Sequence, residues 1–196
     1  MPAGRTLRPP GELYARRIKR KRVLHRIVLK SIAEELTLKI TLITVGKVKE
    51  KYFREAIDEY AKRISRYHRL DMVEVADEMT PDGAPAAVEE RILRTEGERI
   101  LHKIPAGSYV ITLEIKGEMV DSVGLSRRMD SLALKGESHL CLIIGGSLGL
   151  APEVSQRADW KLSFSPMTFP HQLMKVILLE QIYRACRISS GEPYHK

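Results

Sequence analysis

The stretch LCLIIGGSLGL at residues 140–150 decides the fold class, because a fully apolar run passes directly into a glycine-rich loop. An unbroken run of apolar and β-branched residues is typical of a strand buried on both faces of a parallel sheet. Gly145, Gly146 and Gly149 follow the spacing G-G-x-x-G, which is neither a dinucleotide fingerprint nor a Walker phosphate loop. Two interpretations of this loop stay open: a tight strand-to-helix turn, or a place where backbone groups approach a ligand closely.

Strand and helix patterns alternate along residues 38–196, which places the chain in the α/β class. We expect a mostly parallel sheet with helices on both faces, and a ligand site beyond the carboxyl ends of its strands. Apolar and β-branched runs predict strands at 38–45, 72–76, 108–115, 140–144 and 161–164. Apolar residues at helical spacing predict helices at 51–67, 88–104, 126–134 and 173–187, and a short helix opening at Pro152. The pair Lys116-Gly117 predicts a turn after the third strand.

The amino-acid composition is that of a globular protein with a hydrophobic core. Its 196 residues are 43% apolar and 30% charged, as expected for one globular domain of ordinary size. No run of about 18 apolar residues occurs, so we expect no membrane-spanning helix and a cytoplasmic location. Cys141 and Cys186 lie in apolar stretches and form no Cys-x-x-Cys or Cys/His cluster, which predicts two buried thiols, no disulfide framework and no zinc site.

The net charge of +8 is concentrated in the first 37 residues. This segment holds ten basic and three acidic side chains, a net +7, whereas residues 38–196 hold 23 basic and 22 acidic side chains, a net +1. We therefore interpret residues 1–37 as a basic N-terminal extension and residues 38–196 as the folded domain. Three interpretations of the extension stay open: a disordered tail or a start codon set too early, an arm that binds nucleic acid, and a targeting segment.

A second candidate segment joins the last predicted strand to the last predicted helix. Its sequence is SFSPMTFPHQ at residues 163–172, where two prolines stiffen a loop that contains Phe164, Met167 and Phe169. Apolar residues in such a loop usually pack on something, and an adenine ring or a methionine tail would suit them as well as the protein core. His171 opens the helix, either as a ligand-binding or basic group or as a structural residue.

The third candidate is the C-terminal tail, GEPYHK at residues 191–196, which places an aromatic ring, an imidazole and a cation together. Several basic residues on the predicted helices could contact RNA phosphates, although such residues more often form a solvated helix face. They are Arg127, Arg128, Lys175, Arg184 and Arg187.

Taken in order along residues 38–196, these segments resemble the RlmH (YbeA-like) family of SPOUT methyltransferases. The matching sequences are KITLITVGK at 39–47, VITLE at 110–114, IGGSLG at 144–149, LSFS to FPHQ within 162–172, and PYHK at 193–196. The resemblance implies a SPOUT-type α/β fold with a C-terminal trefoil knot, and a homodimer. It also implies S-adenosyl-L-methionine (SAM) as methyl donor without a metal, and methylation of N3 of a pseudouridine in large-subunit (23S) rRNA on the assembled 70S ribosome.

The resemblance also implies site residues, position by position. The catalytic positions would be Tyr194 and His195, and which of them acts as the base is left open. Removal of a proton from the acceptor nitrogen and in-line orientation of the two substrates are what such a transfer requires. The SAM-binding positions would be Leu113, Gly145, Phe164, Ser165, Pro166, Met167, Thr168 and Phe169.

Residues 1–37 depart from the resemblance, because Leu38 stands where the family begins with methionine. Our hypothesis is that translation starts at Leu38, since a leucine codon can initiate. Three other functions stay open. A non-catalytic ribosome-assembly factor is disfavoured by the intact glycine loop, and a NAD enzyme by the missing glycine fingerprint after the first strand. A methyltransferase of the same class that acts on tRNA is the third. The near-neutral charge of residues 38–196 fits a substrate presented by a large particle better than it fits tRNA.

Overall fold

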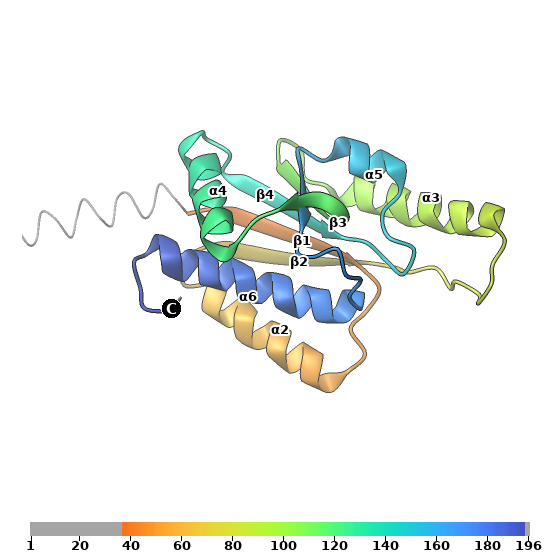
Figure 1. Cartoon of the computed structure of the whole chain (residues 1–196), viewed down its shortest axis with the longest axis horizontal. Helices are drawn as coiled ribbons and strands as arrows, with labels where there is room; N and C mark the ends of the chain where they lie inside the picture. Colours follow the sequence, from red (N-terminus) through yellow and green to blue (C-terminus); the bar gives the residue numbers. More distant parts are fainter. Residues whose placement is uncertain (1–36, 195–196) are drawn as a thin grey trace, which may run out of the picture. The chain divides into compact units, whose positions relative to one another are not determined.

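Within residues 37–194, the part of the chain that the computed structural model describes, five strands form one sheet (Figure 1). In chain order they are β1 (Lys39–Val45), β2 (Arg69–Val75), β3 (Tyr109–Met119), β4 (His139–Ile144) and β5 (Trp160–Ser163). Their order across the sheet is β2-β1-β4-β3-β5, and each neighbouring pair is parallel. The predicted α/β class with a parallel sheet is confirmed. The predictions for the extension at residues 1–37, apart from Thr37, and for His195 lie outside the described residues.

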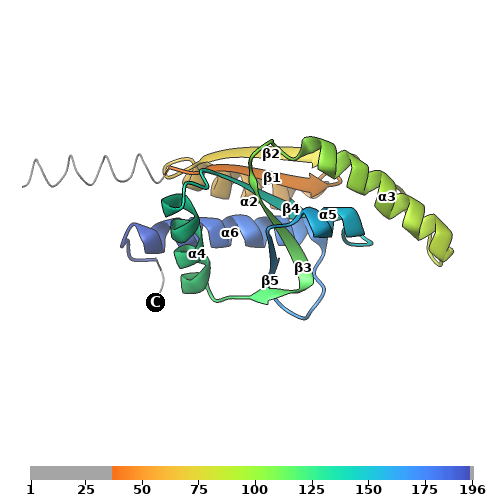
Figure 2. The ribbon, with the colours of Figure 1, turned by 90° about the horizontal axis from the view of Figure 1, so that it is seen from above.

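Helices cover both faces of the sheet, as predicted, because side chains of a central strand point alternately to two cores. Along β4, Leu140, Leu142 and Ile144 pack into one core, whereas Cys141 and Ile143 pack into the other. Figure 1 shows α2 and α6 side by side, and Figure 2 shows α4 and α6 on the same side of the sheet. The first core holds residues of α2 (Lys51–Ile64), α4 (Ser122–Leu134) and α6 (His171–Ser189), and the second holds residues of α3 (Ala86–Lys103) and α5 (Pro152–Arg157). The trefoil knot implied by the resemblance stays a prediction.

The third strand is longer than predicted, and the turn expected at Lys116-Gly117 is wrong. β3 continues through this pair to Met119, and its pairing with β5 shifts register between Leu113 and Glu118. At Gly117 the two backbones approach so closely that a Cβ atom would lie 2.7 Å from the carbonyl oxygen of Lys161. Gly117 therefore permits a close contact between the two strands at an irregularity in their pairing. Glycine inside a strand often marks a bulge or a close approach of this kind.

Helix α4 begins at Ser122, four residues before the predicted start. The residue before it, Asp121, is the N-cap, and its carboxylate accepts a hydrogen bond of 2.6 Å from the backbone N–H of Gly124. Aspartate is among the preferred N-cap residues because its side chain satisfies an otherwise unpaired amide of the first turn. Apolar periodicity missed this turn, since Ser122 and Gly124 interrupt the pattern.

Both cysteines, Cys141 and Cys186, are buried and free, as predicted. Burial raises the pKa of each thiol to about 12, so both stay protonated at neutral pH. Of the helices between residues 37 and 194, none combines the length and the apolar character that crossing a membrane would require.

Gly97 gives a test of how closely α3 approaches the start of α5. A Cβ atom at Gly97 would lie 2.6 Å from the Cβ atom of Ala151. We expect Gly97→Ala to lower the Tm, because crowding of this kind costs about 1–3 kcal/mol and exceeds the helix preference of alanine over glycine, about 1 kcal/mol. Thermal unfolding of both single variants and of the double variant with Ala151→Gly measures the coupling. If Gly97→Ala lowers the Tm equally in the wild type and in the Ala151→Gly variant, the contact between the two residues is contradicted.

Candidate functional site

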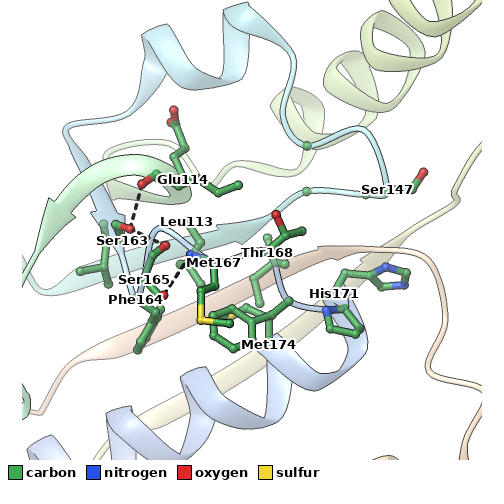
Figure 3. Close-up of a pocket in the computed structure, with 18 of the residues that line it drawn as sticks. Leu113, Glu114, Ser147, Ser163, Phe164, Ser165, Met167, Thr168, His171 and Met174 are labelled. Atoms are coloured by element: carbon green, nitrogen blue, oxygen red, sulfur yellow. Dashed lines mark hydrogen bonds between the residues drawn. The ribbon is translucent and has the colours of Figure 1, made fainter.

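A cavity of about 680 Å³ opens at the carboxyl ends of β4 and β5, beside the middle of β3 (Figure 3). Its walls are the loops that follow β4 and β5, the middle of β3, and His171 and Met174 in the first turn of α6. Its size lies within the range of about 300–1,000 Å³ that is usual for small-molecule sites. Parallel α/β sheets bind their ligands at this edge, where the sequence pattern predicted a site.

The glycine loop is a tight turn that lines the cavity, which confirms the first interpretation of its sequence, while close approach of its backbone to a ligand stays a prediction. The backbone N–H of Gly149 donates to the carbonyl oxygen of Gly146 at 3.1 Å, and Gly149 has a φ of +90°, which disfavours other residues. A side chain at Gly145 would collide with the carbonyl oxygen of Gly149. The loop therefore presents peptide groups to the cavity at its three glycines, beside the side chains of Ser147 and Leu148.

The segment between β5 and α6 is held in shape by short-range hydrogen bonds, drawn as dashed lines in Figure 3. The hydroxyl of Ser163 lies 3.0 Å from the carbonyl oxygen of Ile115 and 3.2 Å from that of Ser165. The Oγ atom of Ser165 accepts a bond of 3.0 Å from the backbone N–H of Met167. These bonds fix the loop against β3 and leave the side chain of Met167 70% exposed at the cavity.

The structure brings together most of the residues that the resemblance assigned to the methyl donor. Two lining residues, Ile115 and Met174, lie outside every segment that the sequence singled out; Met174 was detectable, because it lies one helical turn after His171 on the same face. Pro166 does not line the cavity. The predicted residues that do line it are Leu113, Gly145, Phe164, Ser165, Met167, Thr168 and Phe169.

Tyr194, one of the two predicted catalytic residues, lies away from this cavity in the described chain. Its ring packs edge-on against Tyr183, with centroids 5.0 Å apart, and beneath the guanidinium of Arg184 at 4.9 Å. Its hydroxyl lies 3.3 Å from Oε1 of Glu180, and burial, followed by the charge of Glu180, raises its pKa. These partners lie six to ten residues beyond Met174 on α6, which is about 9–15 Å along the helix axis.

The C-terminal tail is held against its own chain by a second carboxylate. Glu192 accepts a hydrogen bond of 2.8 Å from the hydroxyl of Tyr67 and forms an ion pair of 2.7 Å with Arg187. The arginine is therefore committed to the tail in this arrangement. Tyr194 follows two residues later and is positioned by this clasp.

The basic residues proposed for RNA phosphates divide into two groups. Arg127 and Arg128 are exposed on α4, and the guanidinium of Arg128 lies 5.3 Å from the ring centroid of Trp160. Arg184 and Lys175 are paired instead, with Glu180 at 2.6 Å and with Glu74 at 2.9 Å. The prediction is wrong for Lys175, because it is buried.

Glu96 of α3 is a buried carboxyl group beside the glycine loop, and no pattern in the sequence indicated it. Its side chain is 4% exposed, and its Oε1 atom accepts a bond of 2.9 Å from the backbone N–H of Glu78. Its Oε2 atom lies 2.7 Å from the position that a Cβ atom of Gly146 would take. Burial is the main cause that raises the pKa of this carboxyl group.

In the described part of the chain, no three or more His, Cys, Asp or Glu side chains are grouped so that they could hold a metal ion. The groups that line the cavity are peptide groups, hydroxyls, apolar side chains, the imidazole of His171 and Glu114, whose carboxylate oxygens accept hydrogen bonds from Thr112 and Ser155.

Known proteins resemble the chain over the same residues that form the described domain. The family model described as "Predicted SPOUT methyltransferase" matches residues 38–195. A ribosomal RNA large subunit methyltransferase H from Bifidobacterium adolescentis is 60% identical over 159 residues, and one from Clostridium botulinum is 57% identical; each match covers 81% of this chain and 100% of the relative. The structure of a TrmH/SpoU tRNA modifying enzyme from A. aeolicus aligns with a TM-score of 0.41 and 14% identity, covering 85% of each chain, a likeness too distant to inform the site.

Glu96→Gln tests the buried carboxyl group through pH. Because the pKa of Glu96 is raised above its ordinary value of 4.5, the folded protein binds this proton more tightly than the unfolded chain does. Its ionisation therefore lowers stability as the pH rises above that value. We expect Glu96→Gln to have a higher Tm than the wild type at pH 7, with the difference vanishing below pH 4.5.

The matched control for this comparison is Glu98→Gln, which removes an exposed carboxylate from the same helix. Thermal unfolding followed by circular dichroism across this pH range measures both variants. A difference for Glu96→Gln that does not change with pH would rule out the ionisation as its cause.

Proposed function

The chain belongs to the SPOUT methyltransferase family, and we propose that it transfers a methyl group from SAM to N3 of a pseudouridine in 23S rRNA of the assembled 70S ribosome. The observation that carries the proposal is the convergence of seven of the eight expected donor-binding residues on one cavity. Two relatives that align along their entire lengths are large-subunit rRNA methyltransferases, which supports the choice of substrate.

The cavity suits SAM by its chemistry. Leu113, Phe164, Phe169 and Met174 offer apolar surface to an adenine ring and a methionine chain, while the peptide groups of residues 145–149 offer polar contacts. When bound, SAM supplies an electrophilic methyl carbon: a bond forms to it from N3, the carbon–sulfur bond breaks with its electron pair kept by sulfur, and the N3 proton passes to a base.

The contribution of the cavity residues is positioning. The bond from Met167 N–H to Ser165 and the anchoring of Ser163 at Ile115 give the loop after β5 one shape. The closed turn of residues 145–149 does the same for the opposite wall. Walls that need no rearrangement orient two substrates at the lowest entropic cost, which is a large share of the acceleration that such transfers allow.

We propose Tyr194 and His195 as the catalytic residues, with His195 the better suited base. An imidazole changes charge near neutral pH, whereas burial beside Glu180 raises the pKa of Tyr194 and disfavours its phenolate. Because Tyr194 is docked on Tyr183, the tail has to leave this contact to reach its own cavity, or else enter the cavity of a second copy in a homodimer.

An assembled particle is a more suitable substrate than free RNA for this chain. Residues 38–196 carry a net charge of only +1, and affinity for free nucleic acid depends on many lysine and arginine contacts with phosphates. Arg127 and Arg128 on α4 are the exposed cations that remain for such contacts among the residues considered above. A shaped surface of rRNA and protein supplies additional contacts that do not depend on charge.

Transfer of labelled methyl groups from SAM to purified ribosomes tests the proposal. We expect incorporation into 23S rRNA of 70S ribosomes that contain pseudouridine, and little into ribosomes that lack it. The Gly145→Arg variant should show neither incorporation nor SAM binding by calorimetry, because a side chain at residue 145 collides with Gly149. Its circular dichroism spectrum is the control for folding.

Each alternative has its own outcome in this experiment. Equal activity on free rRNA would refute the requirement for the particle. Incorporation into tRNA instead would favour a tRNA-directed enzyme, and wild-type protein that binds no SAM would favour a non-catalytic assembly factor.

A further inference from the structure

A second hollow, of about 280 Å³, adjoins the larger cavity, and we propose that it receives the uracil ring of the target nucleotide. It shares Leu162, Ser163 and Phe164 with the larger cavity. Figure 3 shows Ser163 and Phe164 at the end of the larger cavity opposite His171, which places the shared wall there. This inference rests on the proposed function and extends it from the methyl donor to the recognition of the acceptor.

The position of the hollow is the one that methyl transfer requires. A reacting nitrogen has to come within about 3–3.5 Å of the methyl carbon, so the acceptor needs a space that meets the donor cavity directly. The volume is below that of sites for drug-sized ligands, which begin at about 300 Å³, and so suits a single flat ring. Phe164 offers an aromatic face at the boundary, and stacking on aromatic side chains is how proteins commonly hold an unstacked base.

Gln181 of α6 supplies a fixed amide in this hollow. The hydroxyl of Ser122 donates to Oε1 of Gln181 at 2.7 Å, and Nε2 of Gln181 donates to Oε2 of Glu180 at 2.7 Å. An amide has two lone pairs on its oxygen and two hydrogens on its nitrogen, so one of each remains after these bonds. The remaining N–H is complementary to a carbonyl oxygen on the edge of a uracil ring.

Asp121 supplies an acceptor that distinguishes pseudouridine from uridine. One of its carboxylate oxygens caps α4 through Gly124, which leaves the second oxygen for a ligand. An ionised carboxylate accepts hydrogen bonds and cannot donate them. In pseudouridine the sugar is attached to carbon, so the ring carries an N1–H group in addition to N3–H, whereas in uridine N1 is bonded to the sugar. With N3 at the boundary to the donor, N1–H points into the hollow, where Asp121 lies.

The test is Asp121→Asn, because asparagine is as good an N-cap as aspartate and keeps the bond to Gly124. With its oxygen held by the cap, the new amide presents hydrogens to the hollow and cannot accept from N1–H. We expect kcat/KM on pseudouridine-containing ribosomes to fall at least about tenfold. The fall should be much smaller on ribosomes with uridine at the site, and the calorimetric Kd for SAM should not change.

Two further variants complete the experiment. Gln181→Leu should lower kcat/KM on both kinds of ribosome, because the ring carbonyl oxygen that its N–H meets is common to both bases. Asp58→Asn, an exposed change on α2, should leave kcat/KM and the preference for pseudouridine as in the wild type.

The outcomes separate the two proposals. If wild-type protein is active and Asp121→Asn keeps both its kcat/KM and its preference for pseudouridine, the assignment of the hollow is overturned while the proposed function stands. If the wild type methylates neither kind of ribosome, the proposed function fails, and the assignment of the hollow fails with it.

Discussion

At the end of β4 the carbonyl oxygen of Gly149 occupies the space in which a side chain of residue 145 would begin. The chain can make this turn only with glycine there, and the next residue, Gly146, is in turn pressed against Glu96 and against Val45 of β1. One steric constraint thus connects the central strands, α3 and the floor of the larger cavity. The opposite wall of the cavity is connected to the same strands, because the loop after β5 is bonded to β3, the strand that is paired directly with β4.

Among residues 37–194, the buried acidic and basic side chains are Glu96 and Lys175. Lys175 in the first turns of α6 is buried, and its ammonium group reaches Glu74 of β2 at 2.9 Å. An ammonium group without this partner would cost several kcal/mol of desolvation, on the order given for buried ions. The pair joins the start of α6 to β2, in the helix turn that also carries His171 and Met174 of the cavity lining. A residue that sequence reasoning assigned to RNA contacts has a structural role instead.

The sequence predicted the elements well where burial alone determines them. The predicted bounds of β4, α2 and α6 lie close to the observed ones. A strand or helix with a wide buried face needs apolar residues at regular intervals, and this periodicity is visible in the sequence. Contacts between distant segments are a different matter: nothing local marks Gly117 as a close approach to β5, Glu96 as a partner of Gly146, or Tyr194 as docked on Tyr183. The cavity residues were found through family resemblance, and Asp121 was overlooked although its N-cap signal is local.

The strand order has a consequence for the way the chain is made. In the described sheet the neighbours of β3 are β4 and β5, which are both synthesised after it. Residue 39 of β1 pairs with residue 139 of β4, so this pairing cannot form until 100 more residues have been added. During translation the first strand therefore exposes one unpaired edge until most of the domain has left the ribosome. Unpaired edges of apolar strands invite association with other chains, and pairings this distant in sequence form slowly. For a nascent chain of this topology, protection of that edge before β4 is made would lower the risk of such association.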